Sequence, residues 1–81
     1  MIFSVEVKAA DQLQQEPSEV EIYLDEEGLD FLLSQLAFLK QKKTDHIHLM
    51  TPSWGGDELT EDRQNPSNLL VHHLRITVLE R

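Results

Sequence analysis

Residues 45–59 read DHIHLMTPSWGGDEL, and this stretch decides how the chain is organised. Its first half has the pattern of a strand, because side chains alternate between the two faces of an extended chain. The set expected to face a core is Ile47, Leu49 and Thr51, and the set expected to face outward is His46, His48 and Met50. Pro52 cannot donate to a strand ladder and ends the strand. The two glycines that follow Trp54 predict a turn, with positive backbone angles at both.

Two further alternating segments precede this stretch. In residues 2–8 the expected inward positions are Phe3, Val5 and Val7, with Glu6 among the outward ones. In residues 19–24 they are Val20, Ile22 and Leu24. Alternation of apolar and polar residues is typical of half-buried strands. The two segments therefore predict an antiparallel hairpin.

An amphipathic helix is expected between the hairpin and the histidine-rich strand. Asp25 is a suitable N-cap, and Glu26 and Glu27 follow where the helix dipole favours negative charge. Lysines at its end match the opposite pole of the dipole. The apolar stripe consists of Leu29, Leu32, Leu33, Leu36 and Leu39. This spacing predicts a helix whose leucine face covers one face of a sheet.

Two phenylalanines do not fit the leucine stripe. Phe31 and Phe38 are seven positions apart and so lie on one helix face, roughly opposite Leu29 and Leu36. Either the helix has a broader buried face than the stripe indicates, or the pair forms a self-association patch of a homodimer.

A fourth strand is expected over residues 69–79, with Leu74, Ile76 and Val78 facing the core. Together these segments predict one α+β domain over residues 1–81. Its expected architecture is a four-stranded antiparallel sheet in the order β-β-α-β-β, with the helix packed on one face. The other sheet face would carry the histidines.

Composition restricts the function classes. Fifteen acidic residues oppose seven basic ones in 81 residues, for a net charge of −8. Such a field repels nucleic acid and anionic membranes and attracts basic proteins. The chain has no cysteine, which excludes disulfides and thiolate metal sites, and its N-terminal residues show no signal peptide or transmembrane pattern. We expect a cytoplasmic protein.

Three histidines form a candidate metal site. His46 and His48 share one strand face, and His73 on a neighbouring strand would supply a third ligand, as in zinc sites with an open position. The alternative is that these are ordinary surface histidines. Enzyme activity is not expected, because Ser53 after Pro52 lacks the strained turn or oxyanion site that nucleophilic catalysis requires.

A candidate partner-binding site surrounds Trp54. Tryptophan is over-represented among the residues that dominate interface affinity. The alternative is that its side chain folds back and caps the end of the sheet. The acidic residues that would surround an exposed Trp54 are Asp57, Glu58, Glu61 and Asp62.

The stretch 45–59, together with the later His-His-Leu at His72, resembles a family of small bacterial α+β immunity proteins of polymorphic toxin systems. The resemblance extends from Val20 to about Val78. The residues that carry it are His46, His48, Trp54, Gly55, Gly56, His72 and His73. It implies a non-enzymatic protein that neutralises a cognate toxin, expected to be basic, by direct contact. Trp54, the acidic residues and the histidines His46 and His48 would then form the contact surface.

Overall fold

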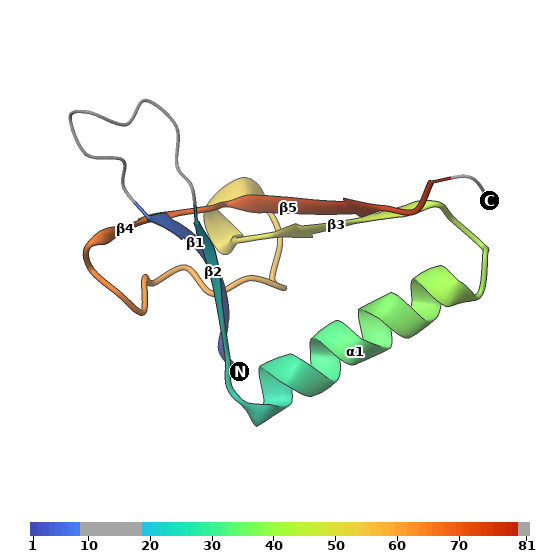
Figure 1. Cartoon of the computed structure of the whole chain (residues 1–81), viewed down its shortest axis with the longest axis horizontal. Coiled ribbons are helices and arrows are strands. Elements are labelled where there is room, and N and C mark those ends of the chain that lie inside the picture. The colour runs from blue at the N-terminus through green and yellow to red at the C-terminus, as the bar shows by residue number, and fades with distance from the viewer. Residues whose placement is uncertain (9–18, 80–81) are drawn as a thin grey trace.

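The computed structural model describes residues 1–8 and 19–79. Within these ranges the elements, in chain order, are β1 (Phe3–Lys8), β2 (Val20–Leu24), α1 (Glu26–Lys40), β3 (His46–Met50), the 3₁₀ helix η1 (Pro52–Trp54), β4 (Asn68–Leu70) and β5 (His73–Thr77) (Figure 1). Neither helix in these ranges is long and apolar enough to cross a membrane. The predicted α+β class with one α-helix is confirmed.

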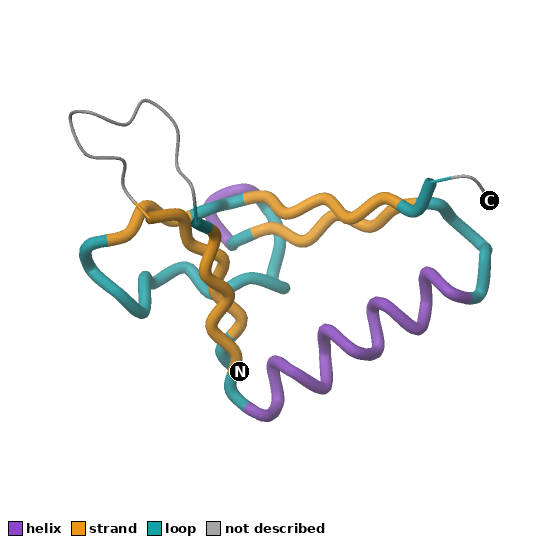
Figure 2. Tube along the Cα trace, viewed as in Figure 1, coloured by secondary structure: helices purple, strands orange, loops and turns teal. Residues whose placement is uncertain are grey.

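The strands form two small antiparallel sheets, so the prediction of a single four-stranded sheet is wrong. One sheet has the order β2-β1-β4 and the other pairs β3 with β5 (Figure 2). The predicted fourth strand divides at Val71 and His72. The amide of Val71 donates to Val5 O at 2.8 Å, whereas His72 O accepts from Thr51 N at 3.0 Å. These two residues therefore carry the chain from the first sheet to the second.

Strand β1 is buried on both faces. Phe3 and Val5 lie in the core, as predicted, but Ser4 and Glu6 are also fully buried. Glu6 was expected to face outward, and that expectation is wrong because the long segment between η1 and β4 covers this face. Within that segment, Thr60 donates its amide to Phe3 O at 2.7 Å and accepts from Phe3 N through Oγ1 at 2.8 Å.

Strand β2 is an edge strand, and its expected inward face is largely exposed. Val20 and Ile22 are exposed, whereas Leu24 packs against the core. The prediction that all three face a core is therefore wrong for the first two. The register of the hairpin itself is antiparallel, with Phe3 opposite Leu24 and Val7 opposite Val20.

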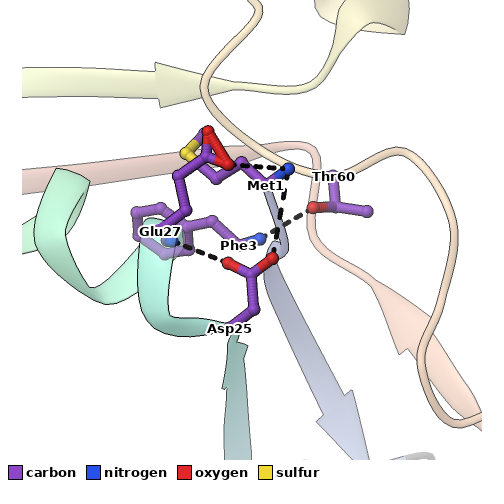
Figure 3. Close-up of polar contacts among 6 residues, drawn as sticks. Met1, Phe3, Asp25, Glu27 and Thr60 are labelled. Atoms are coloured by element: carbon purple, nitrogen blue, oxygen red, sulfur yellow. Dashed lines mark hydrogen bonds and ion pairs between the residues drawn. The ribbon is translucent and has the colours of Figure 1, made fainter.

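The start of α1 is joined to the chain start, and Phe3 near the chain start is bonded in turn to Thr60 of the long segment (Figure 3). Asp25 is the predicted N-cap, and its Oδ1 accepts from Gly28 N at 2.7 Å. The N-terminal amine lies 3.4 Å from Glu27 Oε2. Gly28 is required by a close approach, because a Cβ there would collide with the carbonyl of Ile2. Helix propensity does not indicate this requirement, because it ranks glycine only as a poor helix former.

Only part of the leucine stripe of α1 faces the core. Leu39 is buried and Leu32 packs against the core cluster. Phe31 is half-buried and meets Phe3 edge to face, with ring centroids 6.3 Å apart. The buried face is therefore rotated toward Phe31. Leu29, Leu33 and Leu36 are exposed, so the prediction that they cover the sheet is wrong.

The β3 and β5 ribbon has the predicted alternation. Its inner face carries Ile47, Leu49 and Thr51, all buried, and the partly buried Leu74, Ile76 and Val78. Its outer face carries the histidines. This ribbon therefore positions the candidate site.

Candidate functional site

The outer face of β3 and β5 gathers the three predicted histidines. The register sets His48 opposite Arg75 and Met50 opposite His73. The ring centroids of His46 and His48 are 5.0 Å apart, as are those of His48 and His73. His48 Nδ1 lies 2.8 Å from His73 Nε2, at hydrogen-bond distance. The predicted clustering of these residues is confirmed.

The cluster is not arranged as a metal centre. Two nitrogen ligands of a tetrahedral zinc ion, each about 2.0–2.1 Å from the metal, lie about 3.3 Å apart. The shorter spacing of His48 and His73 is that of a nitrogen sharing a proton with its neighbour. Among the described residues, no group of three or more His, Asp or Glu side chains is placed to hold a metal ion.

Trp54 closes the tight turn that follows β3. Its amide donates to Thr51 O at 2.9 Å, and the amide of Gly55 donates to Pro52 O at 3.0 Å. Gly55 has φ +89°, which favours glycine. Gly56 has no positive φ, contrary to expectation. It is glycine for a different reason: a Cβ there would meet the side chain of Glu58 and lie 2.5 Å from Met50 O.

The indole ring of Trp54 is exposed but held in place. Its accessible fraction is 58 %. The ring lies almost parallel to the imidazole of His72, with 8° between planes and 6.0 Å between centroids, and its centroid is 6.2 Å from that of His73. The ring is therefore exposed and ordered at once, and its role in partner binding stays a prediction. Neighbouring ring centroids lie 5.0–6.2 Å apart along the series His46, His48, His73, Trp54 and His72, hereafter the aromatic row.

His72 is the site residue that residue-level reasoning missed, although the family resemblance included it. Its Nδ1 lies 2.7 Å from Thr51 Oγ1 and 3.6 Å from Glu61 Oε2. His72 lies where the chain passes from one sheet to the other, and the sequence does not mark this position. These contacts fix the ring on which Trp54 stacks.

The contacts of His72 do not form a catalytic triad. In a triad the base uses one ring nitrogen for the nucleophile and the other for the orienting carboxylate. Here Thr51 and Glu61 both approach Nδ1, and Thr51 is fully buried. Ser53 Oγ donates to Glu61 at 2.8 Å. These contacts orient the imidazole of His72 and, through stacking, the indole of Trp54.

The four predicted acidic residues divide into two kinds. Glu58 is half-buried and accepts from the amides of Met50 at 3.2 Å and Asp57 at 2.9 Å. Burial raises the pKa of Glu58, but these amide bonds outweigh it and the pKa is lowered. Glu61 accepts from Ser53 N and Oγ, both at 2.8 Å, and these bonds lower its pKa. Asp57 and Asp62 are exposed.

Glu6 holds the segment that follows the candidate site along the chain, a role that its sequence position did not indicate. It accepts hydrogen bonds from Ser4 Oγ at 2.6 Å, Gln64 N at 2.7 Å, Asn65 N at 3.3 Å and Asn68 Nδ2 at 3.1 Å. Burial raises the pKa of Glu6, yet these donors together lower it. One carboxylate thus fastens the segment between η1 and β4 to strand β1.

A carboxylate lies at each end of the aromatic row, Asp45 beside His46 and Glu61 beside His72. Asp45 Oδ1 lies 2.7 Å from His46 Nδ1, and this contact lowers the pKa of Asp45. Partial removal from water and the nearby His46, His73 and Arg75 lower the pKa of His48. The row therefore favours a neutral imidazole at its centre. Flat, prepositioned rings of this kind suit recognition of another surface.

Comparison with known proteins identifies a family whose model matches this chain. A family model described as immunity protein 32 matches residues 19–74, a range that includes α1 and the whole aromatic row. Searches of curated proteins and of solved structures give no match. The match covers well over half of the 81 residues, and the chain belongs to the immunity protein 32 family.

Proposed function

We propose that this immunity protein neutralises a cognate bacterial toxin by direct contact, without catalysis, through a surface centred on Trp54. The observation that carries the proposal is the state of the indole ring: 58 % exposed and stacked on His72. A large apolar ring in water serves the fold poorly, whereas tryptophan is enriched among the residues that dominate binding energy.

The position of Trp54 supports an anchoring role. Backbone hydrogen bonds close its turn. Glu61 accepts a hydrogen bond from the amide of Ser53 and lies 3.6 Å from Nδ1 of His72. A side chain that is already ordered loses less conformational entropy on binding. The aromatic row extends this anchor along β3 and β5, so His46 and His48 would contribute contact area at its far end.

The charge of the chain supports a basic partner. The net charge of −8 attracts a positively charged surface and accelerates its capture. Asp57 and Asp62 are exposed and would meet cations of the toxin. Glu58 and Glu61 belong to the proposed surface by position, but their oxygens already accept hydrogen bonds within the loop. We therefore expect Asp57 and Asp62 to contribute more to the rate of association.

The test is co-expression with the product of the neighbouring reading frame in the host genome. The proposal expects that this product arrests growth alone, that the immunity protein restores growth, and that the two purify together in a complex that salt weakens. Restoration of growth without any complex would contradict neutralisation by contact. A complex whose affinity is independent of salt would contradict the electrostatic part.

A zinc-binding function is the second candidate, because three imidazoles lie on one face of the ribbon. It requires His48 and His73 to give up their mutual hydrogen bond. Calorimetric titration with zinc checks it directly, and an absence of heat would remove it. The cytoplasmic location and the homodimer through Phe31 and Phe38 stay predictions, and the second would rely on Phe38, since Phe31 packs on Phe3.

A further inference from the structure

The exposed leucines of α1 have the spacing of a helix-pairing seam. Leu29, Leu33 and Leu36 leave 45 %, 55 % and 40 % of their surface accessible. With Glu26 before them and Lys40 after them, the intervals are three, four, three and four residues. These are the intervals of the a and d positions of a heptad, which face a partner helix. The seam of α1 is defined as these five residues.

The seam is complementary to itself when reversed. Its centre is Leu33, its flanks are Leu29 and Leu36, and its ends are an acid and a base. In an antiparallel pair centred on Leu33, Glu26 lies opposite Lys40 of the other helix, and Leu29 lies one residue, about 1.5 Å along the axis, from the level of Leu36. A parallel pair would set acid against acid and base against base. Charge therefore selects the antiparallel arrangement, which a two-fold axis generates.

We propose that α1 pairs with α1 of a second copy of this chain, antiparallel about a two-fold axis at Leu33. The helix has 15 residues and lies along one side of the fold (Figure 1). The histidines of β3 and β5 lie on the outer face of that ribbon, opposite the face that packs in the core. The core uses the adjacent face of the helix through Phe31, Leu32 and Leu39. Pairing would cover the leucines that the fold leaves in water and leave Trp54 accessible to a toxin.

The response to salt distinguishes this dimer from a complex with a basic toxin. Each copy carries a net charge of −8, so the two copies repel each other at long range. Screening this repulsion strengthens an association that rests on leucines. The dimer is expected to tighten as salt is added, whereas a toxin complex is expected to weaken.

Sedimentation of the purified chain, alone and over a wide concentration range, tests the proposal. The parent should reach twice its mass of 9.4 kDa. Leu33→Glu sets two carboxylates against each other at the axis and should give monomer. Ser34→Glu adds the same charge on the adjacent exposed helix position, about 100° away, and should leave the dimer intact. Circular dichroism of each variant verifies that the fold is retained.

Charge exchange gives a second test that does not depend on the folding of Leu33→Glu. Glu26→Lys alone should weaken the dimer, and Glu26→Lys combined with Lys40→Glu should restore it. The chain has no cysteine, so Leu33→Cys should form an intermolecular disulfide on oxidation much faster than Ser34→Cys. A parent that stays monomeric, or a dimer indifferent to these changes, would overturn the proposal. A monomeric parent whose Leu33→Glu variant no longer protects against the neighbouring gene product would instead assign the seam to the toxin.

Discussion

His48 Nδ1 and His73 Nε2 are 2.8 Å apart, so two residues separated by 25 positions share one hydrogen bond across β3 and β5. One nitrogen must donate and the other must accept, and therefore at least one of the two rings lacks a proton at the shared position. Arg75 and His46 lie on the same face and add positive charge nearby. The surroundings of His48, at the centre of the aromatic row, thus favour its neutral form.

The titration of His48 follows from this relationship. Partial removal from water and the charges of His46, His73 and Arg75 should place the pKa of His48 below its ordinary value of 6.5. Because the unfolded chain then binds protons more readily, His48 should reduce the free energy of unfolding as pH falls below that value. NMR titration of the imidazole resonances measures the pKa. His73→Gln should raise the pKa of His48, whereas His72→Gln should not, and equal effects of the two would refute the account.

Replacing the buried carboxylate of Glu6 should release the segment between η1 and β4. In Glu6→Gln one of the two carboxylate oxygens becomes an NH2 group, so a donor faces either Ser4 Oγ and Gln64 N, or Asn65 N and Asn68 Nδ2. We expect the free energy of unfolding in urea to fall by about 1–3 kcal/mol. Glu19→Gln removes the same charge at an exposed position and should change it by less than about 0.5 kcal/mol. Similar losses in both variants would show that Glu6 acts only through net charge.

Acid should unfold the protein through three loop-holding carboxylates. The pKa values of Glu6, Glu58 and Glu61 are all lowered in the fold. Their stabilisation is complete above the ordinary glutamate value of 4.5 and disappears as pH falls through the lowered values. Urea unfolding at a series of pH values should show stability decreasing in this acidic range, with a shallower decrease in Glu6→Gln. Stability that is constant or increasing there would contradict these assignments.

The two glycines after Trp54 should respond differently to alanine. At Gly55 an added Cβ meets nothing, and the cost is that of the positive φ, about 1–2 kcal/mol. At Gly56 the Cβ would lie 2.5 Å from Met50 O, which belongs to backbone and cannot move freely. Gly56→Ala should therefore lower the free energy of unfolding more than Gly55→Ala, by up to about 3 kcal/mol. The reverse order in thermal or urea unfolding would show that the turn is not built as described.

Local patterns in the sequence predicted the elements with periodic burial. The N-cap Asp25, the inward Ile47 and Leu49 and the clustering of His46, His48 and His73 all follow from rules that act over a few residues. The same rules could not predict which strand pairs with which. The segment 69–79 contains no glycine or proline that would mark a break, and only the partners of Val71 and His72 divide it between two sheets.

The remaining differences come from contacts distant in sequence. Glu6 is buried because Gln64 and Asn68, 58 and 62 positions away, donate to it. Gly28 is required by Ile2, and the stack on Trp54 requires His72. The leucine periodicity of α1 identified an apolar face but could not say which part of that face the core would cover.

The most direct test of the proposed function is the affinity of the parent and of Trp54→Ala for the toxin that the parent neutralises, measured by calorimetry at fixed salt. Truncation of a central aromatic anchor should weaken binding by at least about 2 kcal/mol. Urea unfolding of Trp54→Ala should remain cooperative, because the indole is largely exposed. Unchanged affinity in a folded variant would contradict a contact surface centred on Trp54, and loss of folding would show that the ring serves the structure.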